Sequence, residues 1–252
     1  MTTRVAIVTG SAKGIGLAIA RDLTNRGYQV VISDLDGDAA EVAAKELEGS
    51  ISIPCDVRDE QQVRELVDGT VEHYGRLDLM VPNAGIGIVA PILETDLAAW
   101  RAVTSVNLDG VFLSLRWAAP AIIGSGGGSV VSIASVTGTT GTPLVASYAA
   151  SKAAVVNLTK TAASELRELG VRVNAVLPGF IGTDLVNDAT PDFERYLGLP
   201  AGGFAPVVEA KQGRFGTVED VAQAVAFLAD PAQSWITGSA LSIDGGLTAS
   251  LL

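Results

Sequence analysis

The chain has 252 residues, with 28 acidic and 17 basic side chains, and a formal net charge of −11 at pH 7. So acidic a surface repels phosphate backbones, which argues against nucleic-acid binding. The single cysteine, Cys55, excludes a disulfide within the chain, and one cysteine with one histidine, His73, cannot build an ordinary zinc site. We therefore expect no metal centre.

The pattern of apolar residues predicts the compartment. A β-branched strand begins by residue 4, so no signal peptide fits before it. No apolar stretch reaches the roughly 18–20 residues that a membrane helix needs. We expect a cytoplasmic protein that does not enter a membrane.

Strands and helices are predicted to alternate along the chain. Short β-branched runs predict strands near 4–9, 28–33, 50–54, 77–82, 129–134, 171–176 and 240–243. Longer periodic segments predict helices near 14–26, 37–47, 59–74, 96–124, 147–169 and 218–229. Crossovers of about ten or more residues join parallel strands. The prediction is an α/β protein, a single Rossmann-type domain over 1–252, with a doubly wound sheet of seven parallel strands and helices on both faces.

The first strand leads into a glycine-rich turn. Glycines at 10, 14 and 16 follow the apolar run, a helix comes next, and a second strand is closed by Asp34, 20 positions after Gly14. Glycines let a pyrophosphate approach the backbone, and the helix offers free N–H groups. An acidic side chain at this distance accepts hydrogen bonds from a ribose. The spacing is G-x-x-x-G-x-G, and its context favours a dinucleotide site.

A second group of polar residues lies in the middle of the chain. Tyr148 and Lys152 are four residues apart in Y-A-A-S-K, and Ser135 lies thirteen residues before the tyrosine. On a helix, positions i and i+4 share one face. We expect the ammonium to lower the pKa of the phenol, so that Tyr148 acts as a general acid/base. A serine hydroxyl beside it would hold a carbonyl or alcohol oxygen.

Residues 182–213 differ from the rest of the chain. The segment carries several glycines and prolines among apolar residues, and we expect it to be too irregular for one element. Its apolar side chains suggest a pocket wall: Leu185, Phe193, Tyr196, Leu197, Leu199 and Phe204.

These features resemble the short-chain dehydrogenase/reductase family over nearly the whole chain. The similar motifs, in order, are Thr9-Gly10 to Gly16, Asp56-Val57, Asn83-Ala84-Gly85, Asn107, the trio Ser135, Tyr148 and Lys152, Pro178-Gly179 with Thr183, and Asp244-Gly245-Gly246. Two residues depart from the family pattern: Pro82 replaces an asparagine, which puts local sheet geometry in doubt, and Ala134 precedes the serine.

The resemblance implies a site and a reaction. Asn107, Ser135, Tyr148 and Lys152 would be catalytic, with Asn107 kinking a helix and holding a water, and 182–213 would form a substrate-binding lid. The implied cofactor contacts are Gly10, Lys13, Gly14, Ile15, Gly16, Asp34, Leu35, Asp56, Val57, Asn83, Ala84, Gly85, Tyr148, Lys152, Pro178, Gly179, Ile181 and Thr183. The implied reaction is reversible hydride transfer between a nicotinamide cofactor and a small-molecule secondary alcohol or ketone.

Asp34, followed by Leu35, predicts NAD rather than NADP, because a carboxylate repels a 2′-phosphate; Lys13 is the opposing signal. An NADPH-dependent 3-oxoacyl-acyl-carrier-protein reductase is the alternative function, and it would need a basic docking patch, for which Arg116, Arg167 and Arg172 are candidates. A non-enzymatic NAD-binding sensor is the third hypothesis.

Helices that are apolar almost all round predict a homotetramer.

Overall fold

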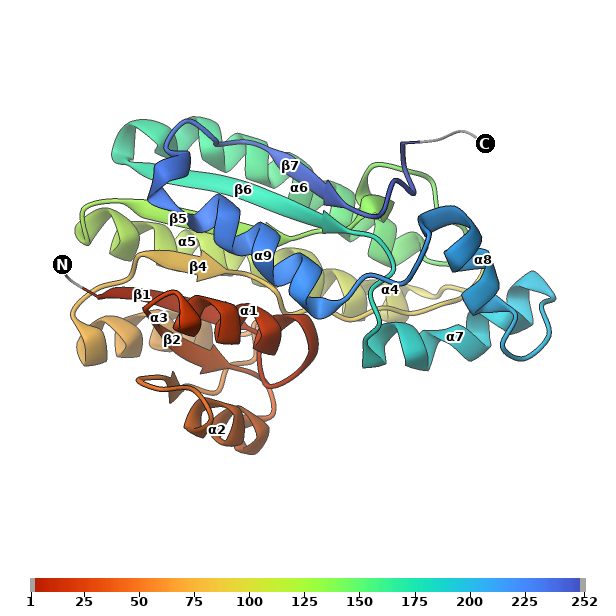
Figure 1. Cartoon of the computed structure of the whole chain (residues 1–252), viewed down its shortest axis with the longest axis horizontal. Helices are drawn as coiled ribbons and strands as arrows, with labels where there is room; N and C mark the ends of the chain where they lie inside the picture. The colour runs from red at the N-terminus through yellow and green to blue at the C-terminus, as the bar shows by residue number, and fades with distance from the viewer. Residues whose placement is uncertain (1–2, 250–252) are drawn as a thin grey trace.

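The architecture is a seven-stranded parallel sheet between two layers of helices. The structure is a computed structural model, and it describes residues 3–249. The strands follow the order β3-β2-β1-β4-β5-β6-β7 (Figure 1). They span β1 Arg4–Thr9, β2 Tyr28–Ser33, β3 Ile51–Ser52, β4 Leu79–Val81, β5 Gly128–Ile133, β6 Val171–Pro178 and β7 Ala240–Ile243. The expected α/β fold class is confirmed.

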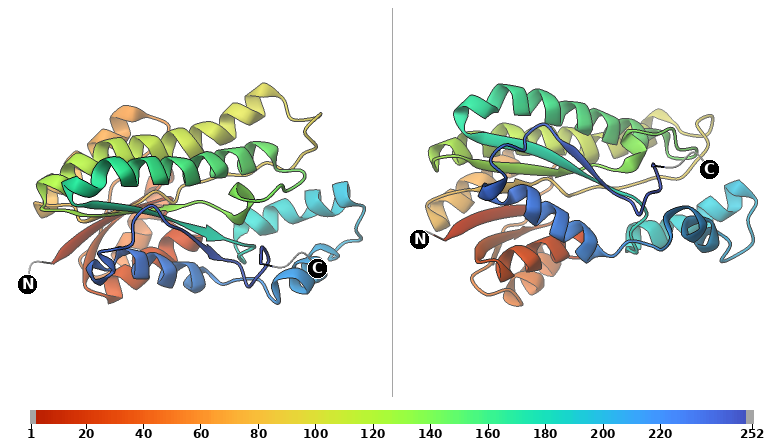
Figure 2. Two further views of the ribbon diagram at one scale, coloured as in Figure 1. Left: turned by 90° about the horizontal axis from the view of Figure 1, so that it is seen from above. Right: turned by 45° about the horizontal axis from the view of Figure 1, so that its top comes forward.

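Two hydrophobic cores hold the helices on the sheet. One core contains α1 (Gly14–Asn25), α2 (Gly37–Lys45) and α9 (Val218–Ala229). The other contains α3 (Glu60–Tyr74), α5 (Gly110–Gly124) and α6 (Ala146–Leu166). Figure 2 shows these layers on opposite sides of the sheet. Strands covered on both faces are buried and apolar, which explains the continuous β-branched runs in the sequence.

Short polar side chains begin several of these helices. Asp36 caps α2 by accepting from the Ala39 N–H at 3.0 Å, and Asp59 caps α3 through the N–H groups of Gln61 and Gln62. Thr217 forms a capping box with Asp220 at the start of α9. Such caps satisfy backbone donors that a helix leaves free.

The strand order reverses direction between β1 and β4. From β1 the chain winds outward to β2 and β3, and it then crosses to β4 on the other side of β1. Open parallel sheets bind ligands at the carboxyl ends of the strands beside such a switch point. The topology therefore places the ligand crevice between the ends of β1 and β4.

The structure corrects one expected element and resolves another. The helix expected over 96–124 is three segments: α4 (Leu97–Thr104), a π-helical turn (Ser105–Asp109) and α5. Residues 182–213, expected to be too irregular for one element, contain two helices, α7 (Asp184–Leu197) and α8 (Phe204–Gln212). The glycines fall at the ends of these two helices, where Gly198 takes a left-handed conformation, so they interrupt the segment without preventing helix formation.

The run Leu97–Gly124 is more apolar than we expected. By length and composition alone it could cross a membrane, but 44% of its most apolar window is buried within the protein. Within it, α5 packs on α3 and on β5. The helix thus behaves as a core element of the fold.

Candidate active site

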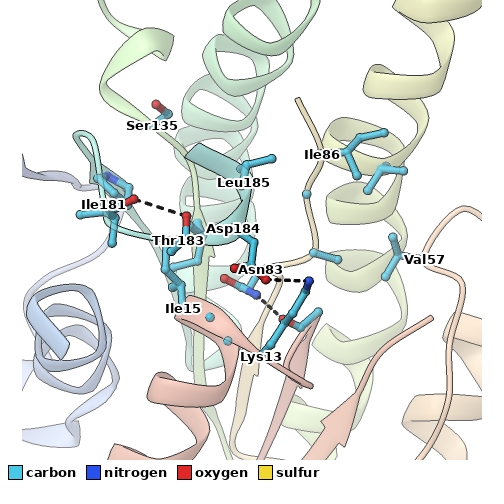
Figure 3. Close-up of a pocket in the computed structure, with 18 of the residues that line it drawn as sticks. Lys13, Ile15, Val57, Asn83, Ile86, Ser135, Ile181, Thr183, Asp184 and Leu185 are labelled. Carbon is cyan, nitrogen blue, oxygen red and sulfur yellow. Dashed lines mark hydrogen bonds and ion pairs between the residues drawn. The ribbon is translucent and has the colours of Figure 1, made fainter. Parts of the chain in front are cut away.

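One cavity opens at the carboxyl ends of the strands. It has a volume of about 380 Å³ and is walled by the glycine turn, the ends of β2, β4, β5 and β6, and the first turns of α6 and α7 (Figure 3). Every residue expected to contact the cofactor lines it, from Gly10 to Thr183. Segments far apart in the sequence therefore meet in one crevice.

Two positions of the glycine turn require glycine, one for its backbone conformation and one for close packing. Gly14 has a φ of +58°, and an added Cβ there would meet no protein atom within 4 Å, so the position faces open space. A Cβ on Gly16 would overlap the Gly10 carbonyl and lie 2.6 Å from Asn83 Nδ2. Gly14 therefore gives a ligand access to the backbone, while Gly16 allows α1 to pack closely on the turn.

The start of α1 is suited to an anion. Among the residues that the structure describes, no side chain caps this helix, and its first turn holds no acidic residue. The backbone N–H groups of the first turn therefore face the cavity without an intramolecular acceptor. A pyrophosphate would accept from them and would also interact with the positive end of the helix dipole.

Asp34 is fixed by the backbone around it. One carboxylate oxygen accepts from the Ala12 N–H at 3.0 Å, and the other accepts from the Asp36 N–H at 3.2 Å. These bonds hold the carboxylate at the mouth of the cavity beside Leu35, which is 69% exposed. The arrangement leaves acceptor lone pairs for ribose hydroxyls.

Asn83 joins the two strands that flank the crevice. Its Nδ2 donates to the carbonyls of Thr9 and Gly10, both at 2.9 Å. The Thr9 hydroxyl accepts in return from the N–H groups of Asn83 and Ala84. Pro82 does not disrupt the neighbouring ladder, because its carbonyl accepts from Ile133 N–H at 3.0 Å.

The three central polar residues converge on the cavity. Ser135 follows the end of β5, and Tyr148 and Lys152 lie on one face of α6, with Lys152 Nζ 5.5 Å from the centre of the Tyr148 ring. All three line the cavity. The ammonium donates to the Ile133 carbonyl at 2.8 Å, which anchors α6 to the end of β5.

The pKa of the phenol differs from our expectation. Burial raises the pKa of Tyr148, and the Ser135 side chain only partly opposes that shift. Burial also lowers the pKa of Lys152 to about 8. Desolvation disfavours the charged form of both groups and here outweighs the attraction that the i, i+4 pair was expected to provide. Tyr148 is therefore a protonated phenol at neutral pH.

Asn107 lies behind the cavity wall, fully buried in the π-helical turn. Its Nδ2 donates to the Ile86 carbonyl at 2.9 Å and, at 3.3 Å, to the Ser151 hydroxyl. Its Oδ1 accepts from the Ile86 N–H at 2.9 Å. The helix is distorted at Asn107, as expected, and the side chain fixes the backbone that follows Gly85.

Two ionisable residues that line the cavity were not predicted as site residues. Asp184, the first residue of α7, pairs with Lys13 across the cavity, with 2.9 Å between Oδ2 and Nζ. Cys55 also lines the cavity, but burial raises the pKa of its thiol to about 12, so it stays protonated. Each directly adjoins a predicted cofactor contact, Asp56 or Thr183, but its side chain reaches the cavity wall only through the packing of distant segments.

Most of the apolar side chains of 182–213 lie behind the cavity rather than on its wall. Leu185 lines it, whereas Phe193 and Phe204 stack with ring centres 4.9 Å apart in a separate core with Val145 and Val208. At its far end α7 is tied to the loop before α4 by a hydrogen bond of 3.0 Å from Tyr196 to Glu94.

Comparison with known proteins agrees with this geometry. Residues 10–248 match a family model described as enoyl-(acyl carrier protein) reductase. The chain is 41% identical to cis-4-hydroxycyclohexanecarboxylate dehydrogenase of Sinomonas cyclohexanicum over 98% of this chain and 97% of that one. It is 38% identical to the 3-oxoacyl-(acyl-carrier-protein) reductase of Thermotoga maritima, over 97% of each chain. The chain belongs to the short-chain dehydrogenase/reductase family.

Solved structures of this family share the fold. Levodione reductase superposes with a TM-score of 0.92 at 33% identity, covering 99% of both chains. A short-chain dehydrogenase/reductase from Mycobacterium marinum gives a TM-score of 0.89 at 35% identity, covering 98% of this chain and 96% of that one. The protein is thus an NAD(P)-dependent oxidoreductase that acts on CH–OH or keto groups.

Proposed function

We propose that this dehydrogenase/reductase transfers a hydride reversibly between NAD(H) and a secondary alcohol or ketone on a carbocyclic ring. The observation that carries the proposal is the convergence of Ser135, Tyr148 and Lys152 on the glycine crevice. The ring is suggested by two relatives named for a hydroxycyclohexanecarboxylate and for levodione. Apolar side chains beside Tyr148, among them Ile86 and Leu185, suit such a substrate.

The residues present fit a nicotinamide dinucleotide. Its pyrophosphate would lie on the free N–H groups at the start of α1, and its adenosine ribose would bond to Asp34. Thr183 and the backbone after Pro178 would hold the nicotinamide end. When bound, the nicotinamide ring supplies or accepts the hydride.

The chain's own residues handle the proton and the oxygen. In the reductive direction the Tyr148 phenol donates its proton to the substrate oxygen as hydride reaches the adjacent carbon; in the oxidative direction the phenolate takes that proton back. Its raised pKa suits the donor role at neutral pH. The Ser135 hydroxyl donates a hydrogen bond to the same oxygen and stabilises its developing charge. Lys152 stabilises the phenolate in the oxidative direction.

We propose NAD as the cofactor. Asp34 and Asp56 are both at the adenosine end of the cavity, and Arg58 holds the pKa of Asp56 below its usual range, so that this carboxylate is ionised at neutral pH. Two bases lie near this end of the cavity, and both are already paired, Lys13 with Asp184 and Arg58 with Asp56. A 2′-phosphate would meet carboxylates without a free cation, and this favours NAD.

The alternative function as an acyl-carrier-protein reductase gains no support from the three arginines considered above. Arg172 donates to backbone carbonyls of Leu228, Ile236, Ala229 and Asp230, at the amino end of β6 and thus away from the cavity. Arg116 and Arg167 lie beside Glu60 and Glu168. They do not form the basic patch that an acidic carrier protein would need.

The test is reduction of NAD by a panel of cyclohexanols, acyclic secondary alcohols and hydroxyacyl thioesters. Cyclohexanols should give the highest kcat/KM. Tyr148→Phe should lower turnover by about 10²–10⁴-fold while NADH still binds. Tyr74→Phe, the same change away from the cavity, should leave turnover intact. A wild-type enzyme that binds NADH but turns over no alcohol would support the sensor hypothesis instead, and preference for the thioester with NADPH would support the carrier-protein reductase.

A further inference from the structure

Lys13 and Asp184 form a bridge over the cofactor cavity. Lys13 comes from the glycine turn and Asp184 from the first turn of α7, 171 positions later, and both line the cavity (Figure 3). Nζ and Oδ2 are 2.9 Å apart. The bridge thus lies between the turn that receives the dinucleotide and the segment after β6.

The surroundings of Lys13 are strongly acidic. Asp184 raises the pKa of the lysine, first through the hydrogen bond and then through its charge, and the charges of Asp188 and Asp34 act in the same direction. The side chains of the pair are 76% and 65% exposed, so the pair adds little to folding stability. Its consequence is instead that the ammonium is occupied and its charge is neutralised.

Among the described residues, Lys13 is also the only exposed cationic side chain that lines the cofactor cavity. Among residues 3–249, the cavity is lined by two cationic side chains, Lys13 and Lys152. Lys152 is buried and donates to the Ile133 carbonyl. A 2′-phosphate on the adenosine ribose could therefore recruit Lys13 from the cavity lining, because the other base nearby, Arg58, already donates three hydrogen bonds to the Asp56 carboxylate.

We propose that Asp184 is a cofactor-specificity residue, which disfavours NADP by holding the ammonium that a 2′-phosphate would otherwise bind. The inference rests on the proposed preference for NAD and adds a second cause to it. Asp34 repels the phosphate directly, and Asp184 occupies the exposed cation in the cavity lining. The two effects come from opposite sides of the cavity and should be separable.

The experiment measures Kd for NADH and for NADPH from nicotinamide fluorescence, with no substrate present. The chains compared are the wild type, Asp184→Asn, Lys13→Gln and the double variant. Asp188→Asn is the matched control, because it removes the same charge from the same helix without breaking the bridge. Melting temperatures verify that each variant is folded.

We expect the wild type to bind NADH more tightly than NADPH. Asp184→Asn should tighten NADPH binding by about fivefold and change NADH binding by less than about twofold, because solvent screens a charge interaction between exposed side chains. Asp188→Asn should have a smaller effect on NADPH. The double variant should lose the gain, because the lysine that provides it is absent.

Three results would overturn the proposal: equal changes for both cofactors in Asp184→Asn, a gain that persists without Lys13, or an effect of Asp188→Asn as large as that of Asp184→Asn. If the wild type binds NADH more tightly than NADPH but the variants give any of these three results, the masking role is wrong and the NAD assignment still stands. A wild type that prefers NADPH contradicts the NAD assignment and the masking role together.

Discussion

The amide of Asn107 is paired with both backbone groups of Ile86, each at 2.9 Å. The Asn107 amide thus makes the two hydrogen bonds that a neighbouring strand would otherwise make with Ile86, and it fixes the backbone after Gly85 beside the cavity. The π-helical turn makes the pairing possible, because the extra residue in the turn aims Asn107 at that segment.

Asn107→Ala should cost about 2–4 kcal/mol of stability, since two partly buried backbone groups of Ile86 lose the hydrogen bonds that the buried Asn107 side chain provides. Chemical denaturation measures this loss, and Asn157→Ala, exposed on α6, is the control. Asn107→Asp keeps the acceptor and loses the donor, so it should fall between the wild type and the alanine variant. Equal stability of all four chains would contradict the pairing.

Lys152 should make stability depend on pH. Its pKa is about 8 in the folded chain and 10.5 unfolded, so between these values the unfolded chain binds more protons and stability rises with pH. Between pH 8 and pH 10.5 the free energy of unfolding of the wild type should rise by up to about 3 kcal/mol relative to that of Lys152→Met. Unfolding at several pH values measures this, and Lys160→Met controls for loss of a positive charge. A constant difference between wild type and Lys152→Met would refute the lowered pKa.

Asp34 and Leu35 should control cofactor preference. Asp34→Ala with Leu35→Arg exchanges a carboxylate for a guanidinium at the adenosine end, and the ratio of kcat/KM for NADPH to that for NADH should rise at least about tenfold. Leu35→Arg alone should give a smaller change, because Asp34 remains. Steady-state kinetics with both cofactors decides; an unchanged ratio would mean that the adenosine binds elsewhere.

At position 144, glycine should give a more stable protein than alanine, which is the reverse of their usual order in regular structure. Leu144 is the one non-glycine residue with a positive φ between residues 3 and 249, at +71°, and its carbonyl accepts from Ala90 N–H at 2.8 Å. Left-handed backbone costs an L-residue about 1–2 kcal/mol, which glycine avoids. Leu144→Gly should therefore be more stable than Leu144→Ala by about 1 kcal/mol in denaturant unfolding. The opposite order would show that this backbone relaxes at no cost.

We propose that the protein is a homotetramer, although part of the reasoning from the sequence does not hold. Val155 and Val156 belong to α6, one of the helices that are apolar almost all round, and both are already buried within one chain. The apolar surface that remains exposed includes Phe112 on α5, at 49%, and Trp235, at 97%. Light scattering should show a tetramer, and Phe112→Asp should lower the mass while Val42→Asp on α2 should not. A wild-type monomer at micromolar concentration would exclude the proposal.

Sequence alone determined the sheet, most helices and the identity of the residues around the cavity. Alternation of β-branched and amphipathic runs is a local property, and glycine spacing with one acidic residue places a ligand by chain geometry. Tyr148 and Lys152 could be named this way because they are four residues apart on one helix, whereas Asn107 was named from the family resemblance.

Tertiary structure decided what depends on several segments at once. The pKa of Tyr148 rises because neighbours from several elements exclude water from it, and no i, i+4 spacing reports that burial. The pairing of Lys13 with Asp184 and the helices within 182–213 likewise arise from packing between parts of the chain that the sequence separates. Periodicity records which face of an element is apolar, whereas the charge that a side chain meets is set by the fold.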